Sequence, residues 1–561
     1  LMKQHILILA VCSAMAATAE DLPHLHSPLG IPLTLSGNFG ELRANHFHSG
    51  LDFKTNGRTG YKIYCADDGY VSRVVVSPWG FGRAVYVAHP STGLTTVYGH
   101  LDSFADKIDR PVRKRQYEQE AFSIDMEFAA GEIPVVKGET IGISGNAGSS
   151  GGPHLHMDVR DTRSGDALDP MPYFKDRITD GVAPEVRQIA VYPRPDGHVA
   201  VAKGRAAYRT PAELGQPIKA WGRVVPGIKA YDRMTGTSNI YGVKYLTFKV
   251  DGNVVYRRVI DRVDFNRTRG VNTLVDNADR YEKGAWVMVT EVPDAAPLGS
   301  MIHTDLPGGV LSIDEERDYK CEFVLEDEHG NRSSAKFVIR GEKVPLKESR
   351  QDGTLFRHDG DNGYSSEGLT VTFPRGTFYD DLYFKVKADT GVRLAPQDKT
   401  VVYTIGDPSV PLAGNYDLSI DLMRDDMQDK SKYCLVRVRN GKRSAVSARY
   451  KDGRMVARPN QLGSYQVTVD TVAPKVIPYQ KAQWAKSGKV VYTISDNLSG
   501  IESYRGEIDG KFMLFELDGK TGKASFRMDP SRLTKGKRHT VKMTVTDACG
   551  NTSSATDTFG W

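Results

Sequence analysis

The sequence contains an internal repeat that constrains its architecture more than any local propensity does. Four short anchors occur in the same order in two stretches of the 561-residue chain. The paired anchors are 180–186 (DGVAPEV) with 470–476 (DTVAPKV), 232–236 (DRMTG) with 496–500 (DNLSG), 250–252 (VDG) with 508–510 (IDG), and 327–335 (DEHGNRSSA) with 547–555 (DACGNTSSA). Chance does not produce four anchors in register, so we expect two modules with one fold.

The segments between the anchors alternate apolar and polar residues, as in 245–250 (YLTFKV) and 539–546 (HTVKMTVT), and end at Asp-Gly, Gly-Asn or Pro turns. This period of two indicates antiparallel strands, and about ninety residues of them make a β-sandwich. The first copy carries a large insertion between its third and fourth anchors. Residues 343–469 have strands of their own, such as 369–373 (LTVTF), but do not match the anchors, which predicts a separate β domain.

Both copies end in a D-x-x-G-N-x-S pattern, which resembles the last hairpin of bacterial immunoglobulin-like modules. Such modules bind the cell wall or a partner protein, or act as rigid spacers. Fold alone does not decide between these roles. We favour the spacer interpretation and keep an envelope protein partner as the alternative.

The first twenty residues differ in composition from the rest of the chain. Lys3 precedes an almost wholly apolar run over 6–17, and small residues follow at 17–19. This run is too short to span a bilayer, so we expect a secretory signal peptide over 1–19 that is cleaved before Glu20. Cys12 lacks the small residue that should precede a lipidated cysteine, and we do not expect a lipid anchor. We therefore expect an exported protein of the periplasm or cell envelope with no membrane span.

The overall composition is that of ordinary globular domains, with 40% hydrophobic and 25% charged residues. The net charge of +5 is too dilute over this length to indicate a nucleic-acid partner. Outside the signal segment the cysteines are Cys65, Cys321, Cys434 and Cys549, far apart and without a C-x-x-C pair. We expect four buried thiols, one in each domain, rather than an interdomain disulfide or a zinc cluster.

Histidines are concentrated near the N-terminus, with nine of the fourteen in the first 156 residues. They occur in three informative strings, 48–52 (HSGLD), 98–101 (YGHL) and 151–156 (GGPHLH). On a strand, residues i and i+2 point to one face, so His154 and His156 should share a face. Two imidazoles and a carboxylate suit zinc, and three protein ligands leave a fourth position for a water that the metal activates.

The order and context of these strings are more specific than the strings themselves. Residues 36–53 (SGNFGELRANHFHSGLDF), 97–101 (VYGHL), 136–142 (VKGETIG) and 144–160 (SGNAGSSGGPHLHMDVR) closely resemble the lysostaphin-type zinc endopeptidases, the LytM-like peptidoglycan hydrolases. The resemblance runs from about residue 30 to 172. It implies a small, mostly antiparallel β sheet with the metal in a groove between loops.

The resemblance also implies a role for each site residue. His48, Asp52 and His156 match the zinc ligands of the family. His154 matches the general base, and His100 matches the histidine that assists the water or the tetrahedral oxyanion. Family members cleave peptide bonds in the stem peptides or cross-bridges of bacterial cell walls.

Other residues near the strings leave two interpretations open. The segment 102–134 lengthens the loop after His100 and either walls the groove or is an inert excursion. Arg43 and Asn45 contact substrate or buttress their loop. His24 and His26 contact the metal or, as we favour, belong to an exposed tail.

The sequence thus predicts a mostly β chain, with a small antiparallel β metallopeptidase domain followed by an array of β-sandwich domains. The predicted divisions are a signal peptide at 1–19, a zinc peptidase domain at 20–178, immunoglobulin-like modules at 179–342 and 470–561, and a separate β domain at 343–469. We expect a zinc endopeptidase that acts on peptidoglycan peptides. The alternative is a non-enzymatic envelope scaffold or hydrolase activator with a vestigial peptidase domain.

We also expect the β modules to be dispensable for chemistry. Their anchors are turn and strand-end residues, and they contain no cluster that resembles a second active site. If peptidase surface is buried against the first module, a chain that ends near residue 178 would be unstable for reasons unrelated to the mechanism, so its folding must be checked first.

Overall fold

The computed structural model describes residues 22–201, 203–346, 352–391 and 395–561. The predicted signal peptide and Cys12 lie outside the described residues. The chain is mostly β, as predicted, and its helices are few and short. They are α1 (Asp106–Glu118), α2 (Met171–Phe174), α3 (Asn277–Lys283) and α4 (Trp484–Ser487), with 3-10 turns η1 (Lys175–Arg177), η2 (Pro211–Glu213), η3 (Phe265–Thr273), η4 (Gly299–Met301), η5 (Pro307–Gly309), η6 (Lys430–Lys432) and η7 (Lys481–Gln483). Within the described ranges, none of the helices combines the length and apolar character of a membrane span.

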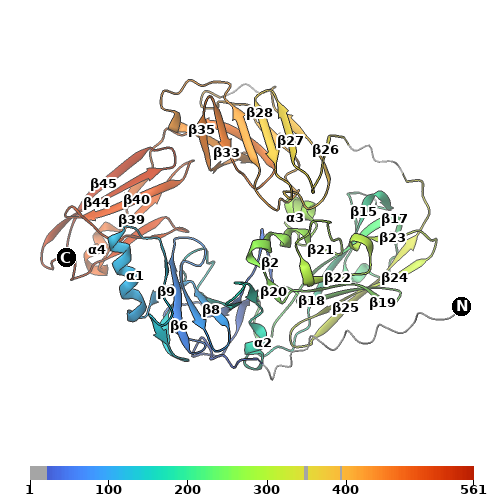
Figure 1. Cartoon of the computed structure of the whole chain (residues 1–561), viewed down its shortest axis with the longest axis horizontal. Coiled ribbons are helices and arrows are strands. Elements are labelled where there is room, and N and C mark those ends of the chain that lie inside the picture. Colours follow the sequence, from blue (N-terminus) through green and yellow to red (C-terminus); the bar gives the residue numbers. More distant parts are fainter. Residues whose placement is uncertain (1–21, 202, 347–351, 392–394) are drawn as a thin grey trace.

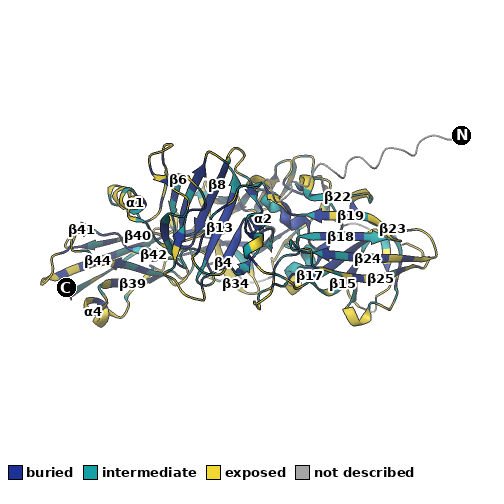
Figure 2. Cartoon of the chain, turned by 90° about the horizontal axis from the view of Figure 1, so that it is seen from below, coloured by how far each residue is buried: buried dark blue, intermediate teal, exposed yellow. Residues whose placement is uncertain are grey.

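The N-terminal domain is built on a ten-stranded sheet with the order β1-β4-β13-β8-β7-β6-β10, extended by β11, β14 and β20. A smaller sheet has the order β5-β12-β9, and β2 pairs with β3. The strands are β1 (Leu35–Gly37), β2 (Leu42–Arg43), β3 (His46–Phe47), β4 (Leu51–Lys54), β5 (Lys62–Tyr64), β6 (Gly69–Val76), β7 (Arg83–His89), β8 (Leu94–Gly99), β9 (Leu101–Phe104), β10 (Ile124–Glu127), β11 (Pro134–Val135), β12 (Thr140–Ser144), β13 (His154–Asp161) and β14 (Ala167–Leu168). Strand β13 lies between β4 and β8 and is buried along most of its length (Figure 2).

The first β module forms one continuous ten-stranded sheet rather than the two sheets of the predicted sandwich. Its two longest strands, β15 and β17, pair along most of their length with register shifts that mark bulges. The strands of this region are β15 (Glu185–Val199), β16 (Ala207–Arg209), β17 (Ile218–Tyr231), β18 (Tyr245–Val250), β19 (Asn253–Val259), β20 (Arg262–Val263), β21 (Met288–Val289), β22 (Ile302–Thr304), β23 (Leu311–Ile313), β24 (Asp318–Glu326) and β25 (Arg332–Gly341). The predicted insertion supplies β19 to β23, η3 and α3, and β20 leaves this sheet to join that of the N-terminal domain.

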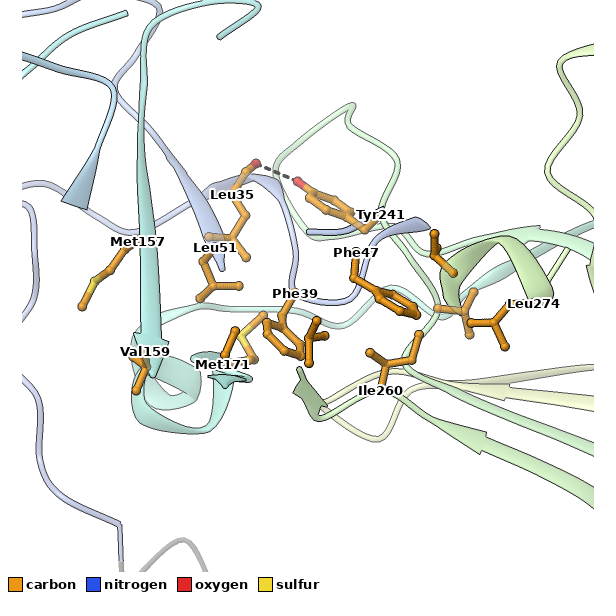
Figure 3. Packing of buried hydrophobic residues seen from close by; sticks show 14 of the residues in the cluster. Leu35, Phe39, Phe47, Leu51, Met157, Val159, Met171, Tyr241, Ile260 and Leu274 are labelled. Carbon is orange, nitrogen blue, oxygen red and sulfur yellow. Dashed lines mark hydrogen bonds between the residues drawn. The ribbon is translucent and has the colours of Figure 1, made fainter. Parts of the chain in front are cut away.

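The N-terminal domain and the first module share one hydrophobic core (Figure 3). Phe39 and Phe47 of the N-terminal domain lie beside Ile260 and Leu274 of the module, and all four are buried. Strand β14 pairs with β20 across the joint. The hydroxyl of Tyr241 donates a hydrogen bond of 2.7 Å to the carbonyl of Leu35. The peptidase-like sheet therefore does not end at a domain boundary, and the N-terminal domain buries surface against the first module.

The remaining two regions each have their own core. The third region has two five-stranded sheets and a two-stranded sheet formed by β26 and β29, and the C-terminal module has two sheets. Residues 353–469 contain β26 (Thr354–Phe356), β27 (Asn362–Ser366), β28 (Leu369–Phe373), β29 (Leu382–Phe384), β30 (Val386–Ala388), β31 (Tyr403–Ile405), β32 (Asp417–Asp421), β33 (Tyr433–Arg439), β34 (Lys442–Val446), β35 (Ala448–Lys451), β36 (Arg454–Ala457) and β37 (Gly463–Val469). The C-terminal module contains β38 (Lys475–Pro478), β39 (Lys489–Ser495), β40 (Ile501–Ile508), β41 (Lys511–Phe512), β42 (Glu516–Asp518), β43 (Lys523–Arg527), β44 (Arg538–Asp547) and β45 (Thr552–Gly560). Its two four-stranded sheets are β38-β39-β43-β42 and β41-β40-β44-β45.

The four regions follow one another around a ring, so that the C-terminal module returns to the N-terminal domain (Figure 1). Helix α1, which lies in the segment 102–134, makes this contact: the ring of Tyr117 meets Phe512 edge-on and lies under the guanidinium of Arg532 at 3.6 Å. Arg505 of the module forms an ion pair of 2.6 Å with Glu120. The long loop thus docks the C-terminal module.

The four cysteines outside the signal segment are buried, as predicted. They are not isolated from one another, however, because Cys434 and Cys549 share a small apolar cluster at the joint between the last two regions. The prediction of one separate thiol per domain did not include this contact.

A chain that ends at residue 178 should be much less stable than a chain that ends at residue 342. The shorter chain lacks the residues that cover Phe39 and Phe47, and exposing one large apolar side chain costs about 1.5–3 kcal/mol. Total stabilities are only about 5–15 kcal/mol. We expect the shorter chain to melt at a clearly lower temperature or to aggregate, as measured by circular dichroism on heating. Equal melting temperatures would contradict the shared core.

Candidate metal centre

Two histidines and one aspartate converge at one end of the N-terminal sheet. Asp52 lies on β4 opposite His156 on β13, and His48 lies just after β3. The Nε2 atom of His48 is 3.0 Å from Asp52 Oδ1 and 3.1 Å from His156 Nδ1, and His156 Nδ1 is 2.9 Å from the same carboxylate oxygen. All three side chains are buried. The three atoms that the sequence predicts as metal ligands therefore face one point.

Strand alternation explains this placement. Leu51, Met157 and Val159 point into the core (Figure 3), so their neighbours Asp52, His156 and Asp158 occupy the opposite face of the sheet. The antiparallel register of β4 and β13 then brings Asp52 beside His156, although the two residues are distant in sequence.

Hydrogen bonds behind each imidazole fix which nitrogen faces the centre. His48 Nδ1 donates to the carbonyl of Asn38 at 2.6 Å, and His156 Nε2 donates to Asp158 Oδ1 at 2.6 Å. In the neutral rings the nitrogens that face the centre, His48 Nε2 and His156 Nδ1, are then lone-pair acceptors. Three acceptors that face one another without a donor repel, and a cation between them removes the repulsion. The donor set fits a zinc ion.

The electrostatics of the centre favour positive charge. Burial opposes protonation of His156, yet the carboxylates of Asp158 and Asp52 raise its pKa to about 9. Burial alone would raise the pKa of Asp52, but the neighbouring His48, His154 and His156 hold it well below its usual range. The centre therefore stabilises an anionic carboxylate and a positive charge beside it.

Two more histidines border the centre. His154 Nδ1 donates to the carbonyl of Gly152 at 2.8 Å, and His154 Nε2 is 3.3 Å from Asp52 Oδ1. His100 Nδ1 donates to the carbonyl of Ala147 at 2.8 Å, and the His100 and His154 rings are 4.7 Å apart. In a neutral ring with this hydrogen bond, Nε2 is free to accept a proton.

The backbone of His100 is unusual. Its φ is 62°, the left-handed region that a non-glycine residue rarely adopts and that often marks functional sites. Its own N–H donates to the carbonyl of Phe81 at 2.8 Å, which holds this turn at the end of β8. Burial, followed by the nearby His156 and His154, lowers the pKa of His100 to about 3, so the ring is neutral near pH 7.

The residues for which the sequence left two interpretations open lie as follows. Arg43 Nη2 is 3.0 Å from Asp52 Oδ2, the oxygen that does not face the histidines. The Asn45 side chain accepts a hydrogen bond of 3.1 Å from Asn272 of the first β module. His24 is exposed, but His26 packs edge-on against Tyr64, so the expectation of an exposed tail is wrong for His26.

Two residues of the centre escaped the sequence analysis as functional residues. Asp158 is fully buried, and it accepts hydrogen bonds from His156, Ser49 and Arg160. Burial opposes its ionisation, but His156 and Arg160 hold its pKa at about 2. Asp158 follows His156 by two residues on the same strand, so the alternation that places His154 and His156 on one face also places Asp158 there. The sequence therefore contained a signal for Asp158. Phe81, whose ring stacks on His156 at 4.7 Å, carries no sequence signal of this role.

The C-terminal module contacts the loops that carry these groups. Arg83 forms an ion pair of 2.6 Å with Glu516, and Lys520 donates a hydrogen bond to the carbonyl of Asn146, next to Ala147. Gly519 lies against the ring of Trp79, two residues before Phe81. The module therefore braces both loops that hold His100.

An antiparallel sheet with two histidines and an aspartate at one end, and two further histidines beside them, is the arrangement of a metallopeptidase domain. An uncharacterized metalloprotease of Haemophilus influenzae is 31% identical over 124 residues, which are 22% of this chain and 20% of that protein. The chain thus spans about a fifth of the length of this curated relative.

Solved structures also match about a quarter of the chain. A mutant catalytic domain of the prophage-encoded M23 protein EnpA from Enterococcus faecalis is 25% identical, with 25% of this chain and 91% of that chain covered and a TM-score of 0.19. A zinc containing peptidase from Vibrio cholerae is also 25% identical, with 26% and 38% covered and a TM-score of 0.19. A family model described as a Zu5-like domain matches residues 353–470. The chain is thus similar, over about a quarter of its length, to metallopeptidases of the M23 type.

Replacing Asp52 with alanine should abolish stoichiometric zinc, because it removes the only anionic group of the predicted ligand set. Zinc per chain would be measured by inductively coupled plasma mass spectrometry after dialysis. Asp169→Ala is a matched control, since Asp169 is also a buried aspartate of this domain but pairs with Lys244 at the module joint. Full zinc retention in Asp52→Ala would show that the ligand assignment is wrong.

Proposed function

We propose that this protein is an exported zinc endopeptidase that hydrolyses peptide bonds in peptidoglycan stem peptides or cross-links. The observation that carries the proposal is the convergence of His48 Nε2, Asp52 Oδ1 and His156 Nδ1 at 2.9–3.1 Å from one another. The substrate class follows from the resemblance to LytM-like hydrolases. Export follows from the apolar segment at 6–17.

Zinc is the proposed metal because two imidazole nitrogens and one carboxylate oxygen form a borderline ligand set. His48, Asp52 and His156 would hold it, and Asp158 would orient His156 from behind. A bound zinc supplies Lewis-acid activation of water and of the scissile carbonyl. Arg43 stabilises the carboxylate of Asp52 through the oxygen that faces away from the histidines.

His154 is the proposed general base. The carbonyl of Gly152 holds the hydrogen on Nδ1, so Nε2 presents a lone pair at the centre and can take a proton from the attacking water. The protonated ring can then give that proton to the nitrogen of the leaving amine. This role needs the ring to stay where it is during turnover, which the Nδ1 hydrogen bond provides.

His100 is proposed to assist the same step from the other side. Its neutral ring also presents Nε2 as an acceptor, so it can hold the water in position by accepting a hydrogen bond. It becomes a donor toward an oxyanion only after it has taken up a proton. Assistance of the water is therefore the simpler of the two roles that the resemblance implies.

The contacts of the C-terminal module support a role of the β array in positioning the site residues, rather than a role as a passive spacer. Its contacts with Arg83 and Asn146 reach the two loops that fix the backbone and ring of His100. The alternative of a non-enzymatic scaffold leaves the convergence of five polar side chains, all retained from the family pattern, without an explanation.

His154→Ala should keep its zinc and lose turnover by about 10²-fold or more, the usual scale for a general base. The assay is mass spectrometry of defined peptidoglycan fragments incubated with the zinc-loaded full chain. His26→Ala, a partly buried histidine beside Tyr64, is the matched control and should keep full turnover. Simultaneous loss of zinc and activity in His154→Ala would reverse the assignments of His154 and His156. A zinc-loaded wild-type chain that cleaves no peptidoglycan peptide would contradict the proposed function.

A further inference from the structure

The two β modules carry matching triads of aspartates at the repeated anchors. The first triad is Asp180, Asp232 and Asp327, and the second is Asp470, Asp496 and Asp547. Each aspartate is the first residue of an anchor, so the two triads correspond position by position. In both triads, the ligand oxygens all lie within 4.8 Å of one another.

The first triad brings together three separate segments. Asp180 belongs to the linker between η1 and β15, Asp232 follows β17, and Asp327 follows β24. Asp232 and Asp327 are 4% and 3% exposed. A cavity of about 20 Å³ is lined by all three aspartates, which is space for one ion or one water molecule.

Backbone N–H groups hold two members of this triad: Asp180 Oδ1 accepts from Val182 and Thr235, and Asp327 Oδ1 accepts from His329 and Asn331. Within the described residues, no lysine, arginine or histidine forms an ion pair with its members, and the nearby Lys244 pairs instead with Asp169 and Glu328. The buried carboxylate of Asp232 accepts a single hydrogen bond, from the N–H of Arg233. Asp180 Oδ2 is buried and accepts none from the described residues.

Burial is the main cause that raises the pKa of Asp232, to about 8, and the charges of Asp327 and Asp180 add to it. A buried carboxylate with this surrounding either keeps a proton or binds a cation. The two states can be distinguished by adding a metal ion, which binds only if the carboxylates form a cation site.

The second triad lies in a separate module and is also largely buried. Asp470 and Asp547 are each 1% exposed. Asp496 Oδ1 and the neighbouring Ser499 Oγ are buried and have no hydrogen-bond partner in the described part of the chain. Within the same ranges, no basic side chain forms an ion pair with these aspartates.

The hydrogen bonds of one asparagine beside each triad are also repeated. Asn331 Nδ2 donates to Asp327 Oδ2 at 2.8 Å and to the carbonyl of Asp180 at 3.4 Å. In the second module, Asn551 Nδ2 donates to Asp547 Oδ2 at 2.8 Å and to the carbonyl of Asp470 at 3.1 Å. The same asparagine thus ties the linker aspartate to the last anchor in each copy.

We propose that each triad binds one Ca²⁺ ion, and that the two ions fix the linkers that lead into the two β modules. The proposal is independent of the peptidase activity. Each triad offers only oxygen ligands, which calcium prefers, and calcium accepts irregular sets of six to eight oxygens at about 2.3–2.6 Å. Magnesium needs a nearly ideal octahedron, and zinc prefers nitrogen and sulfur.

The position of the triads gives the ions a structural consequence. Asp180 lies between the peptidase domain and the first module, and Asp470 lies between the third region and the C-terminal module. An ion that joins each linker to two turns of the following sheet restrains the angle between neighbouring regions. The ring contacts of the C-terminal module with the peptidase loops depend on that angle.

The test is calorimetric titration of the zinc-loaded full chain with calcium chloride in calcium-free buffer. The wild-type chain should bind two Ca²⁺ ions, Asp232→Asn one, Asp496→Asn one, and the double variant none. Asp389→Asn, which changes an exposed aspartate, is the control and should still bind two. Dissociation constants should fall at or below the range of extracellular calcium modules, about 10⁻⁴–10⁻³ M.

Calcium should also raise the melting temperature of the wild-type chain and leave that of the double variant unchanged. Absence of binding and of any melting shift at about 10 mM calcium, well above that range, would overturn the proposal and show that the carboxylates keep a proton. Unchanged stoichiometry in both single variants would overturn the site assignment. Tighter binding of magnesium in the same experiment would overturn the choice of calcium. Because the two sites are independent, a folding defect in one variant leaves the other as the test.

Discussion

The centre of this molecule depends on three potential ligand atoms, His48 Nε2, Asp52 Oδ1 and His156 Nδ1, that face one another at 2.9–3.1 Å. The arrangement is stable only if something positive lies among them, because lone pairs and a carboxylate at about 3 Å repel. Hydrogen bonds on the far side of each imidazole hold this arrangement. The carbonyl of Asn38 fixes the ring of His48, and the carboxylate of Asp158 fixes the ring of His156. The sheet holds the positions, since β4 and β13 pair in a register that places Asp52 against His156.

Contacts with two β modules add to the support of the domain that carries the centre. The peptidase sheet continues through β14 and β20 into the first β module, and the two parts share one core. On the opposite side, the C-terminal module contacts α1 and the loops around Phe81 and Ala147, which set the conformation of His100. The first β module and the C-terminal module therefore both contact the domain that carries the metal centre.

The sequence predicted the mostly β architecture and grouped the candidate site residues, because strand alternation and spaced histidine strings are local signals. His154 and His156 share a strand, and their common face follows from a period of two. The same logic extends to Asp158, two residues after His156, to which the sequence analysis assigned no role.

Other features have no local signal. The left-handed backbone of His100 depends on the carbonyl of Phe81, and the stacking of Phe81 on His156 depends on tertiary packing. The segment 102–134 looked like a loop beside the groove, but its helix meets a module that lies almost four hundred residues later in the chain. The first module was expected to be a two-sheet sandwich, but its insertion draws it into one continuous sheet that also touches the peptidase sheet.

The most direct test of the metal centre is anomalous X-ray diffraction at the zinc edge, from crystals of the zinc-loaded full chain. The account predicts one strong peak at about 2.0–2.2 Å from each of His48 Nε2, Asp52 Oδ1 and His156 Nδ1, with His154 and His100 outside bonding distance. A peak bonded to His154 or His100 in place of these atoms, or zinc bound only elsewhere on the chain, would contradict it.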